Sequence, residues 1–259
     1  MNSADRSPAV SPLCGELDAY HDQAFNSAAM NMAIDEALLE IADRPSIRFY
    51  RWDHRALSLG YFGKFAEVKD LAMNFPTIST SARRLRGAPG EDGAEPSKIA
   101  TPGDIVRRWT GGGMVLHGQD LTYALVIPSS AGRDAPSSRF VYAAVHEAIR
   151  EALRCGGHAA ELALTDATAN SEACFERPVV ADVMVSGRKV AGAAHRRTRR
   201  GLLHQGSIQN INIVDKLASS IAGQLSAKVE EQILDEVIMS RATQIAQSKY
   251  STPEWLHRW

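Results

Sequence analysis

Three consecutive glycines, Gly111–Gly113, are a candidate for part of a ligand-binding site. They lie between two apolar segments, and Arg107 and Arg108 come shortly before them. Glycine has no Cβ and permits positive φ, so this backbone could lie directly against a ligand. Side chains alternate along a strand, so one of the two arginines can point into a pocket. A guanidinium beside bare backbone suits a phosphate, a carboxylate or a thioester carbonyl.

A plain hairpin turn is the alternative for these glycines. A P-loop is excluded, because the chain has no GxxxxGK[ST] sequence and we expect no helix directly after the glycines.

Lys189 is a second candidate, because it stands in an otherwise apolar hairpin sequence, SGRKVAGAAH. Gly187 and Gly192 flank it and remove side-chain bulk, as the close approach of a ligand requires. The alternative is an exposed lysine in a turn, which is the usual place for this residue type. Lys189 could therefore bring a positive charge to a bound substrate.

Cys174 is the candidate nucleophile. It precedes Phe175 and Pro178 in a predicted loop, where a thiolate could be presented to a substrate. Reactivity requires a pKa lowered by nearby positive charge, for which Lys189 is a candidate. A buried structural thiol is the alternative, and we expect that role for Cys155 at the end of a helix.

The eight histidines form neither HxH nor HExxH patterns, so we predict no metal site. His117 follows the glycines and His204 lies in a later strand. Both are candidates to line the pocket, with a structural role as the alternative. Four arginines between Arg196 and Arg200 predict a solvated turn, or a surface that contacts an acidic protein.

Helices and strands must position these groups. Apolar residues recur at helical spacing over 26–42, and Asn26 or Ser27 could cap that helix. A second helix is predicted over 137–157, with Ser137 or Ser138 as its cap and two glycines at its end. The following strands are predicted: 46–52, 56–62, 105–109, 122–128 and three within 179–209.

The rest of the chain completes an α+β arrangement of mixed, largely antiparallel sheets flanked by helices. We expect a loose N-terminal segment over 1–25, and one domain over 26–259. Within that domain a polar Gly- and Pro-rich insert occupies 83–102. Residues 214–247 are predicted to be helical, followed by a polar tail.

Composition excludes several classes of protein. The chain has 259 residues, of which 44% are hydrophobic, as is usual for a globular protein. Its formal net charge is -1, so we do not expect a protein that coats nucleic acid. No apolar run approaches the roughly 18 residues of a membrane helix, and no secretory signal is visible. Three cysteines exclude a disulfide framework. These features favour a cytoplasmic protein, and we expect a monomer.

Five sequence segments, in order, together resemble the lipoate-protein ligase A/octanoyltransferase family, which is related to the biotin protein ligase catalytic domain. The segments are NMAIDEALL, SIRFYRWDHRALSLGYF, IVRRWTGGGMVLHGQDLTYALVIP, CFERPVVADVMVSGRKVAGAAHRRTRRGLLHQGSI and KYSTPEW. The resemblance implies that family's catalytic-domain fold, an acyl chain beside Gly111–Gly113, and Lys189 near the acyl carbonyl. It also implies one of two chemistries.

One chemistry is octanoyl transfer, which takes the acyl group from acyl carrier protein onto a cysteine and needs no cofactor. The acyl group then passes to a lysine of a lipoyl domain, as in dehydrogenase E2 subunits and the glycine cleavage H protein. Cys174–Phe175 resembles the CF motif of one octanoyltransferase branch, so this chemistry is our leading hypothesis. The other is ATP- and magnesium-dependent lipoate ligation through a lipoyl-adenylate. A non-catalytic acyl- or carrier-binding protein is a third hypothesis.

Three positions depart from the family pattern. Gly63 follows GYF where glutamine is common, Trp109 replaces a frequent proline, and His195 stands where glutamine is common. These changes could alter acyl length or acceptor choice, or could mark a homologue that no longer catalyses.

Overall fold

The computed structural model describes residues 12–53, 55–68, 76–77, 98–99, 105–129, 136–166, 175 and 178–259. Within these ranges no helix is both long and apolar enough to cross a membrane. The predicted insert at 83–102 lies outside the described residues, apart from Lys98–Ile99.

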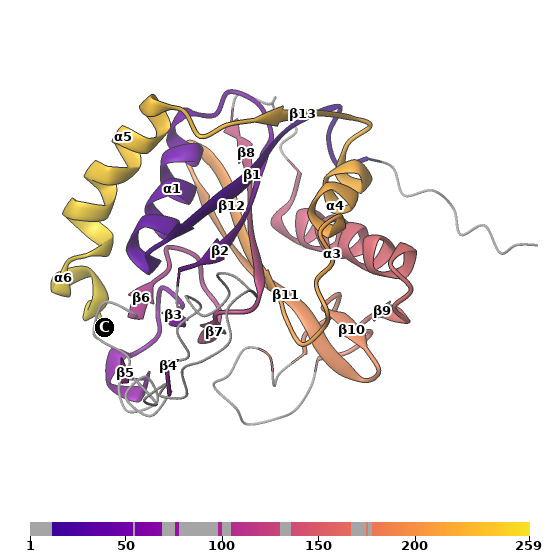
Figure 1. Ribbon diagram of the computed structural model, residues 1–259, viewed down its shortest axis with the longest axis horizontal. Helices are drawn as coiled ribbons and strands as arrows, with labels where there is room; N and C mark the ends of the chain where they lie inside the picture. The colour runs from indigo at the N-terminus through magenta and orange to yellow at the C-terminus, as the bar shows by residue number, and fades with distance from the viewer. Residues whose placement is uncertain are drawn as a thin grey trace, which may run out of the picture.

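The core of the fold is one sheet of eight strands (Figure 1). In spatial order these are β13 (Lys228–Gln232), β1 (Glu16–Asn26), β2 (Ser46–Trp52), β8 (Leu121–Pro128), β12 (Gly201–Ile208), β11 (Arg188–Thr198), β10 (Val183–Val185) and β9 (Ala160–Leu162). β1 runs parallel to β13 and β2, and all other neighbours in this sheet are antiparallel. The sheet is mixed and largely antiparallel, which confirms the prediction.

Helices cover both faces of this sheet (Figure 1). On one face lie α1 (Ala28–Ile41) and α5 (Glu236–Ile245), followed by a π-helical turn (Ala246–Tyr250) and α6 (Pro253–Leu256). On the other lie α3 (Ser138–Cys155) and α4 (Leu217–Leu225). Consecutive residues of β8 enter opposite cores: Leu125 packs with the α3 and α4 side chains, and Val126 with those of α1 and α5.

A second sheet of three strands lies beside the glycines. Its order is β6 (Ile105–Arg107), β3 (Ala56–Leu59), β7 (Val115–His117). β3 is parallel to β6 and antiparallel to β7. A separate pair joins β4 (Pro76–Thr77) to β5 (Lys98–Ile99).

Side-chain caps define where the main helices begin. The Ser27 hydroxyl accepts the Met30 N–H, and the Ser137 hydroxyl accepts the Phe140 N–H. Each cap satisfies a backbone donor that has no partner within its helix. Gly156 follows the last turn of α3. Both predicted helices are therefore confirmed, with a predicted cap residue at each start.

The predicted loose N-terminal segment is wrong for residues 16–25, which form most of β1. Glu16 to Tyr20 pair with β13 and Asp18 to His21 pair with β2, so the sheet supplies hydrogen-bond partners on both sides of this part of the strand. Leu17 and Ala19 enter the core with α4, whereas Tyr20 enters the core with α1. Because both faces are covered, the segment lacks the alternation of a half-buried strand.

The helical prediction over 214–247 is wrong for Lys228–Gln232, the edge strand β13. Its charged side chains meet partners across the sheet edge: Lys228 Nζ lies 2.6 Å from Glu16 Oε1, and Glu230 Oε2 lies 2.6 Å from Arg44 Nη2. Charged residues are common on exposed edge strands and discourage pairing with other chains. The predicted polar tail also contains α6, whose Trp255 is buried.

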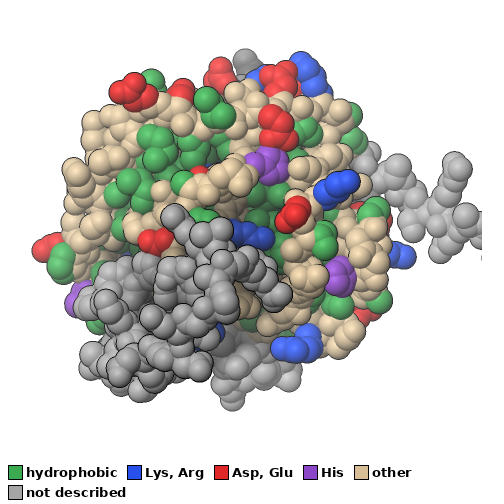
Figure 2. All heavy atoms as spheres, viewed as in Figure 1, with side chains coloured by type: hydrophobic (Ala, Val, Ile, Leu, Met, Phe, Trp, Pro, Cys, Tyr) green, Lys and Arg blue, Asp and Glu red, His purple; other side chains and the backbone are tan. Residues whose placement is uncertain are grey.

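Both signs of charge occur on the molecular face in Figure 2. Acidic and basic side chains are intermingled on the part of this face that described residues form, and neither sign makes a continuous patch there. This distribution agrees with the net charge of -1.

Candidate active site

A pocket lies between the central sheet and the small sheet, and its empty space, including the part open to solvent, is about 420 Å³. Its floor comes from four adjacent strands, β2, β8, β12 and β11, and its opposite wall from β3, β7, Arg108 and Gly112. Of the predicted Gly111–Gly113 segment (the glycine loop), only Gly112 lines the pocket. The lining residues are Met32, Tyr50, Trp52, Ser58, Arg108, Gly112, Val115, His117, Thr122, Gly192, Ala193, Ala194, Gln205, Gly206 and Ser207. Adjacent strands are about 4.8 Å apart, so a groove across four strands extends about 14 Å.

Arg108 holds the glycine loop in place. Its Nη2 donates to the carbonyls of Gly111 and Gly113 at 3.0 and 2.7 Å, and its Nη1 donates to the Ser58 carbonyl at 2.8 Å. Gly112 has φ +83°, where a residue with a Cβ is strained. The loop also passes so close to Gly60 that a Cβ there would lie 1.9 Å from the Gly112 oxygen. Gly60 is thus a requirement of the site that the sequence analysis did not single out.

Arg107 points away from the pocket, which corrects its prediction as a substrate-binding residue. Its guanidinium donates to the carbonyls of Gly60, Tyr61 and Gly63 and to those of Trp255 and Leu256. The alternation argument is confirmed, because only one member of the pair lines the pocket. Arg107 instead joins the small sheet to the C-terminal α6.

Lys189 is buried beside the β11 side of the pocket. Its Nζ lies 2.7 Å from Asp182 Oδ2, and neither side chain is appreciably exposed. The side chain runs over Gly192, where a Cβ would lie only 2.4 Å from Lys189 Cε. Gly192 itself lines the pocket. The predicted exposed-turn alternative for Lys189 is therefore wrong, and Gly192 provides the space that the lysine occupies.

Helix α3 supports the Asp182 carboxylate from behind. The Tyr142 hydroxyl donates to Asp182 Oδ1, and the Val179 N–H donates to Oδ2 at 2.7 Å. One turn along α3, His146 Nδ1 lies 2.8 Å from the Ala181 carbonyl oxygen. Ala181 has φ +70°, an uncommon conformation for a non-glycine residue. The turn that presents Asp182 is thus fixed by its contacts with α3.

Phe175, the residue after Cys174, lies next to Lys189. Its ring centroid lies 5.5 Å from Lys189 Nζ, within the range of a cation–π contact. Cys174 itself lies outside the described residues. Cys14 is partly buried, and burial raises the pKa of its thiol to about 11. Cys155 is exposed at the end of α3, so the prediction that it is buried is wrong, and neither of these two cysteines lines the pocket.

His117 lines the pocket as predicted, with a partner at each ring nitrogen. Nε2 lies 2.6 Å from Ser58 Oγ, and Nδ1 lies 2.7 Å from Asp120 Oδ2. Burial alone would raise the pKa of Asp120, but His117 and hydrogen bonds from Gly118 and Ser207 lower it to about 2. The carboxylate is therefore ionised at neutral pH.

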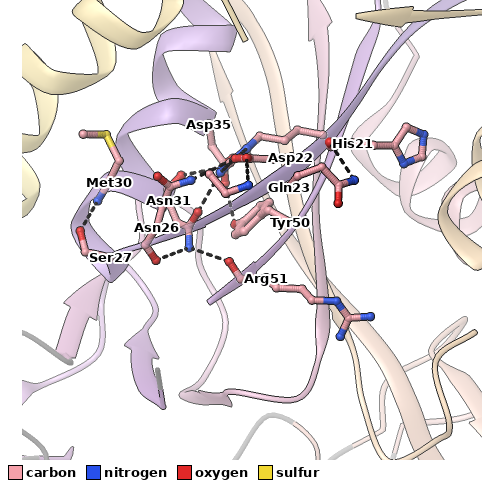
Figure 3. A network of polar contacts seen from close by, with 12 residues as sticks. His21, Asp22, Gln23, Asn26, Ser27, Met30, Asn31, Asp35, Tyr50 and Arg51 are labelled. Carbon is pink, nitrogen blue, oxygen red and sulfur yellow. Dashed lines mark hydrogen bonds and ion pairs between the residues drawn. The ribbon is translucent and has the colours of Figure 1, made fainter. Parts of the chain in front are cut away.

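A buried polar network connects α1 with the glycine loop. Figure 3 shows the part of this network around Asp35 and Tyr50. Asp35 of α1 accepts hydrogen bonds from Arg48, Tyr50 and Gln205 at 2.8, 2.9 and 2.7 Å. The Gln205 Oε1 in turn accepts from Thr110, directly before the glycines, at 2.8 Å. Burial raises the pKa of Asp35, and the Arg48 charge opposes that rise. The acidic residue in the predicted first helix thus fixes one wall of the pocket.

His204 lies on the opposite face of the sheet from the pocket, which corrects its prediction as a substrate-binding residue. Its ring packs near Tyr123, Tyr142 and His146 and is fully buried. Neighbouring Gln205 points to the pocket, so strand alternation sends His204 toward α3. Burial holds its pKa well below the usual value, so the ring is neutral.

No group of three or more His, Cys, Asp or Glu side chains that could hold a metal ion occurs among the residues that the structure describes.

The chain belongs to the family of the lipoyl protein ligase A/B catalytic domain, whose model matches residues 27–254. Octanoyltransferase LipM of Oceanobacillus iheyensis is 31% identical over 228 residues, which cover 84% of this chain and 74% of that protein.

Two solved structures share the fold. Protein Ta0514 of T. acidophilum aligns with a TM-score of 0.66 at 22% identity, covering 95% of this chain and 99% of its own. Lipoate-protein ligase A bound with ATP aligns with a TM-score of 0.61 at 21% identity, covering 94% and 98%. The predicted family and its fold of mixed, largely antiparallel sheets flanked by helices are confirmed.

Proposed function

We propose that this chain is an octanoyltransferase that uses Cys174 as its nucleophile. It takes octanoate from the thioester of acyl carrier protein and delivers it to a lysine of lipoyl domains, those of dehydrogenase E2 subunits and the glycine cleavage H protein. The activity named for the relative from Oceanobacillus iheyensis supports the reaction class. The observation that carries the proposal is the Lys189 ammonium, buried between Asp182, Gly192 and the ring of Phe175.

The pocket supports a medium-length acyl group as the substrate. Its floor has little side-chain bulk near Lys189, where Gly192 and Ala194 lie, and the aromatic side chains of Tyr50 and Trp52 stand at the β2 side. Burying each methylene contributes about 0.8 kcal/mol, so an apolar groove about 14 Å long favours a chain that fills it. The acyl carbonyl belongs at the β11 side, beside Lys189, whose side chain lies against Gly192.

The reaction proceeds in two acyl-transfer steps. The Cys174 thiolate attacks the carrier thioester, the bond from carbonyl carbon to carrier sulfur breaks, and the carrier leaves as a thiolate, which takes up the proton that Cys174 released on ionising. The amine of the acceptor lysine then attacks the cysteine thioester, and the amine proton leaves with the enzyme thiol. Exchange between thioesters is nearly thermoneutral and amide formation from a thioester is favourable, so no nucleotide is needed.

Lys189 serves both steps by stabilising negative charge on the acyl oxygen. Asp182 keeps the ammonium group oriented, and exclusion of water strengthens its interaction with a developing oxyanion. The same ammonium favours the thiolate form of a nearby cysteine. One cation therefore accounts for activation of the nucleophile and for stabilisation of the intermediate.

Intact-protein mass spectrometry tests this proposal. After incubation with octanoyl-carrier and no acceptor, we expect one octanoyl adduct, which is absent in Cys174→Ser and unchanged in Cys155→Ser. An adduct that survives Cys174→Ser, or no adduct on the wild type, would reject the cysteine mechanism. Lipoate-dependent pyrophosphate release that is undiminished in Cys174→Ser would instead establish the ATP-dependent ligase.

A further inference from the structure

The pocket wall contains a hydrogen-bonded Ser58–His117–Asp120 array that transfer through Cys174 does not use. Ser58 Oγ lies 2.6 Å from His117 Nε2, and His117 Nδ1 lies 2.7 Å from Asp120 Oδ2. All three side chains are buried, and the first two line the pocket. A nucleophile is thus hydrogen-bonded to a base, and the base is hydrogen-bonded to a group that orients it.

The hydrogen-bond partners of Asp120 define the proton positions in this array. Asp120 accepts from Thr122, Ser207 and the Gly118 N–H as well as from His117, so it remains an ionised acceptor. His117 must then carry its proton on Nδ1, which leaves Nε2 free to accept the Ser58 proton. The Trp52 ring stacks on His117 at 4.0 Å and holds the imidazole in its plane. This arrangement makes His117 a general base directed at Ser58.

Arg108 supplies the positive charge that the same chemistry requires. Its Nη1 donates to Ser58 Oγ at 2.7 Å, which favours the alkoxide character of the hydroxyl. The terminal N–H groups of Arg108 already donate to Ser58 and to two carbonyls of the glycine loop, so its charge acts through space on an oxyanion that forms on a carbonyl attacked by Ser58. One lone pair of Ser58 Oγ accepts from Arg108, and the other remains available for attack.

We propose that Ser58 is a second nucleophile in this pocket and that the Ser58–His117–Asp120 array hydrolyses small carboxylic esters. Ser58 Oγ attacks the ester carbonyl while its proton passes to His117 Nε2. The bond from carbonyl carbon to alkoxy oxygen breaks, and the leaving alcohol takes that proton. Water then attacks the serine ester in the same way, which releases the carboxylic acid and restores Ser58. The array needs no contribution from Cys174.

A fluorophosphonate with a short alkyl chain is the probe for this nucleophile. Attack by Ser58 on phosphorus releases fluoride and leaves a stable phosphonyl serine. We expect one adduct per chain on the wild type, mapped by peptide mass to the peptide containing Ser58 and absent from Ser58→Ala. His117→Gln removes the base, so labelling should slow by about 100-fold or more. Ser46→Ala is the matched control, because Ser46 is a buried serine of β2 that does not line the pocket.

Hydrolysis of 4-nitrophenyl acetate by Cys174→Ser is the second measurement, because in this variant the proposed cysteine nucleophile cannot contribute to turnover. We expect turnover that the fluorophosphonate abolishes in proportion to Ser58 labelling. Absence of an adduct, an adduct mapped to another residue, or turnover that persists in fully labelled protein would overturn the proposal. Neither assay contains a carrier or an acceptor domain, so its outcome is separate from that of octanoyl transfer.

Discussion

The ammonium of Lys189 and the carboxylate of Asp182 are buried together, and each is stable there because of the other. A buried ion pair contributes little compared with an apolar pair, but removing one partner leaves an uncompensated buried charge. The Phe175 ring also lies next to this pair. The proposed contact with the acyl carbonyl gives the buried ammonium a chemical role.

Replacing Lys189 by methionine should affect activity and stability for different reasons. Loss of the cation should reduce the rate of acyl-enzyme formation by about 100-fold, as expected for an oxyanion-stabilising group. The uncompensated Asp182 should lower the free energy of unfolding by about 3 kcal/mol. Stopped-flow acylation and urea unfolding measure the two effects.

The matched control is Lys189→Met combined with Asp182→Leu. The double variant should recover most of the stability, since no unpaired charge remains, and it should recover none of the activity. Recovery of acylation in the double variant would show that Lys189 has only a structural role.

The sequence singled out Lys189 and the glycine loop as candidates, but it could not show which of Arg107 and Arg108 faces the pocket. Alternation along a strand required one of Arg107 and Arg108 to face the pocket. Which one does so depends on the register of β6 against β3 and on the carbonyls of α6, which come from the far end of the chain. His204 was misassigned for a related reason, because its strand is covered on both faces and either face could bind a ligand.

At the scale of elements, α3 controls the geometry of the site without contributing to its lining. The Tyr142 hydroxyl fixes Asp182, and Asp182 fixes Lys189. An unsatisfied buried carboxylate oxygen costs about 1 to 3 kcal/mol. The helix that covers the back of the sheet is thereby coupled to Lys189.

Tyr142→Phe should therefore lower the free energy of unfolding by about 1 to 2 kcal/mol and slow acylation several-fold. Tyr123→Phe provides the control, because the Tyr123 hydroxyl is buried and has no hydrogen-bond partner among the residues that the structure describes. That change should leave the stability the same or raise it slightly. Equal effects of the two substitutions in urea unfolding would contradict the role given to Tyr142.

The elements themselves were predictable where local signals agreed. Ser27 and Ser137 cap helices whose apolar spacing is regular, and both helices are present as predicted. β1 and β13 were missed because their pairing is non-local: Glu16 lies opposite Lys228, more than 200 positions away in the chain. Local composition carries no information on such a contact, and a charged segment such as KVEEQ is equally typical of a solvated helix.

At the scale of the whole molecule, buried neutral histidines should make the fold sensitive to mild acid. Burial lowers the pKa of His146 from 6.5 to about 4, and burial also lowers that of His204. Between pH 6.5 and about pH 4, His146 binds a proton in the unfolded chain but not in the folded chain. The free energy of unfolding therefore falls as the pH falls through this range.

For His146 alone, the free energy of unfolding should be about 2 kcal/mol lower at pH 5 than at pH 7. Urea titrations at the two pH values measure the difference. His146→Asn keeps a donor for the Ala181 carbonyl and should reduce the pH dependence by that amount. A pH dependence as steep in the variant as in the wild type would contradict this assignment.

The length of the pocket should set the preferred acyl donor. Two methylenes fewer remove about 1.6 kcal/mol of apolar burial, so hexanoyl-carrier should acylate the protein about tenfold less efficiently than octanoyl-carrier. Competition between the two donors, read by intact mass, gives this ratio directly. Equal labelling would show that the acyl chain does not occupy the pocket.

A crystal structure of the protein after reaction with octanoyl-carrier, in the absence of an acceptor, tests the central claim most directly. We predict an octanoyl thioester on Cys174, its carbonyl oxygen within hydrogen-bond distance of Lys189 Nζ, and its chain extending over Gly192 toward Trp52. An acyl chain bound elsewhere, or a carbonyl oxygen remote from Lys189 Nζ, would contradict it.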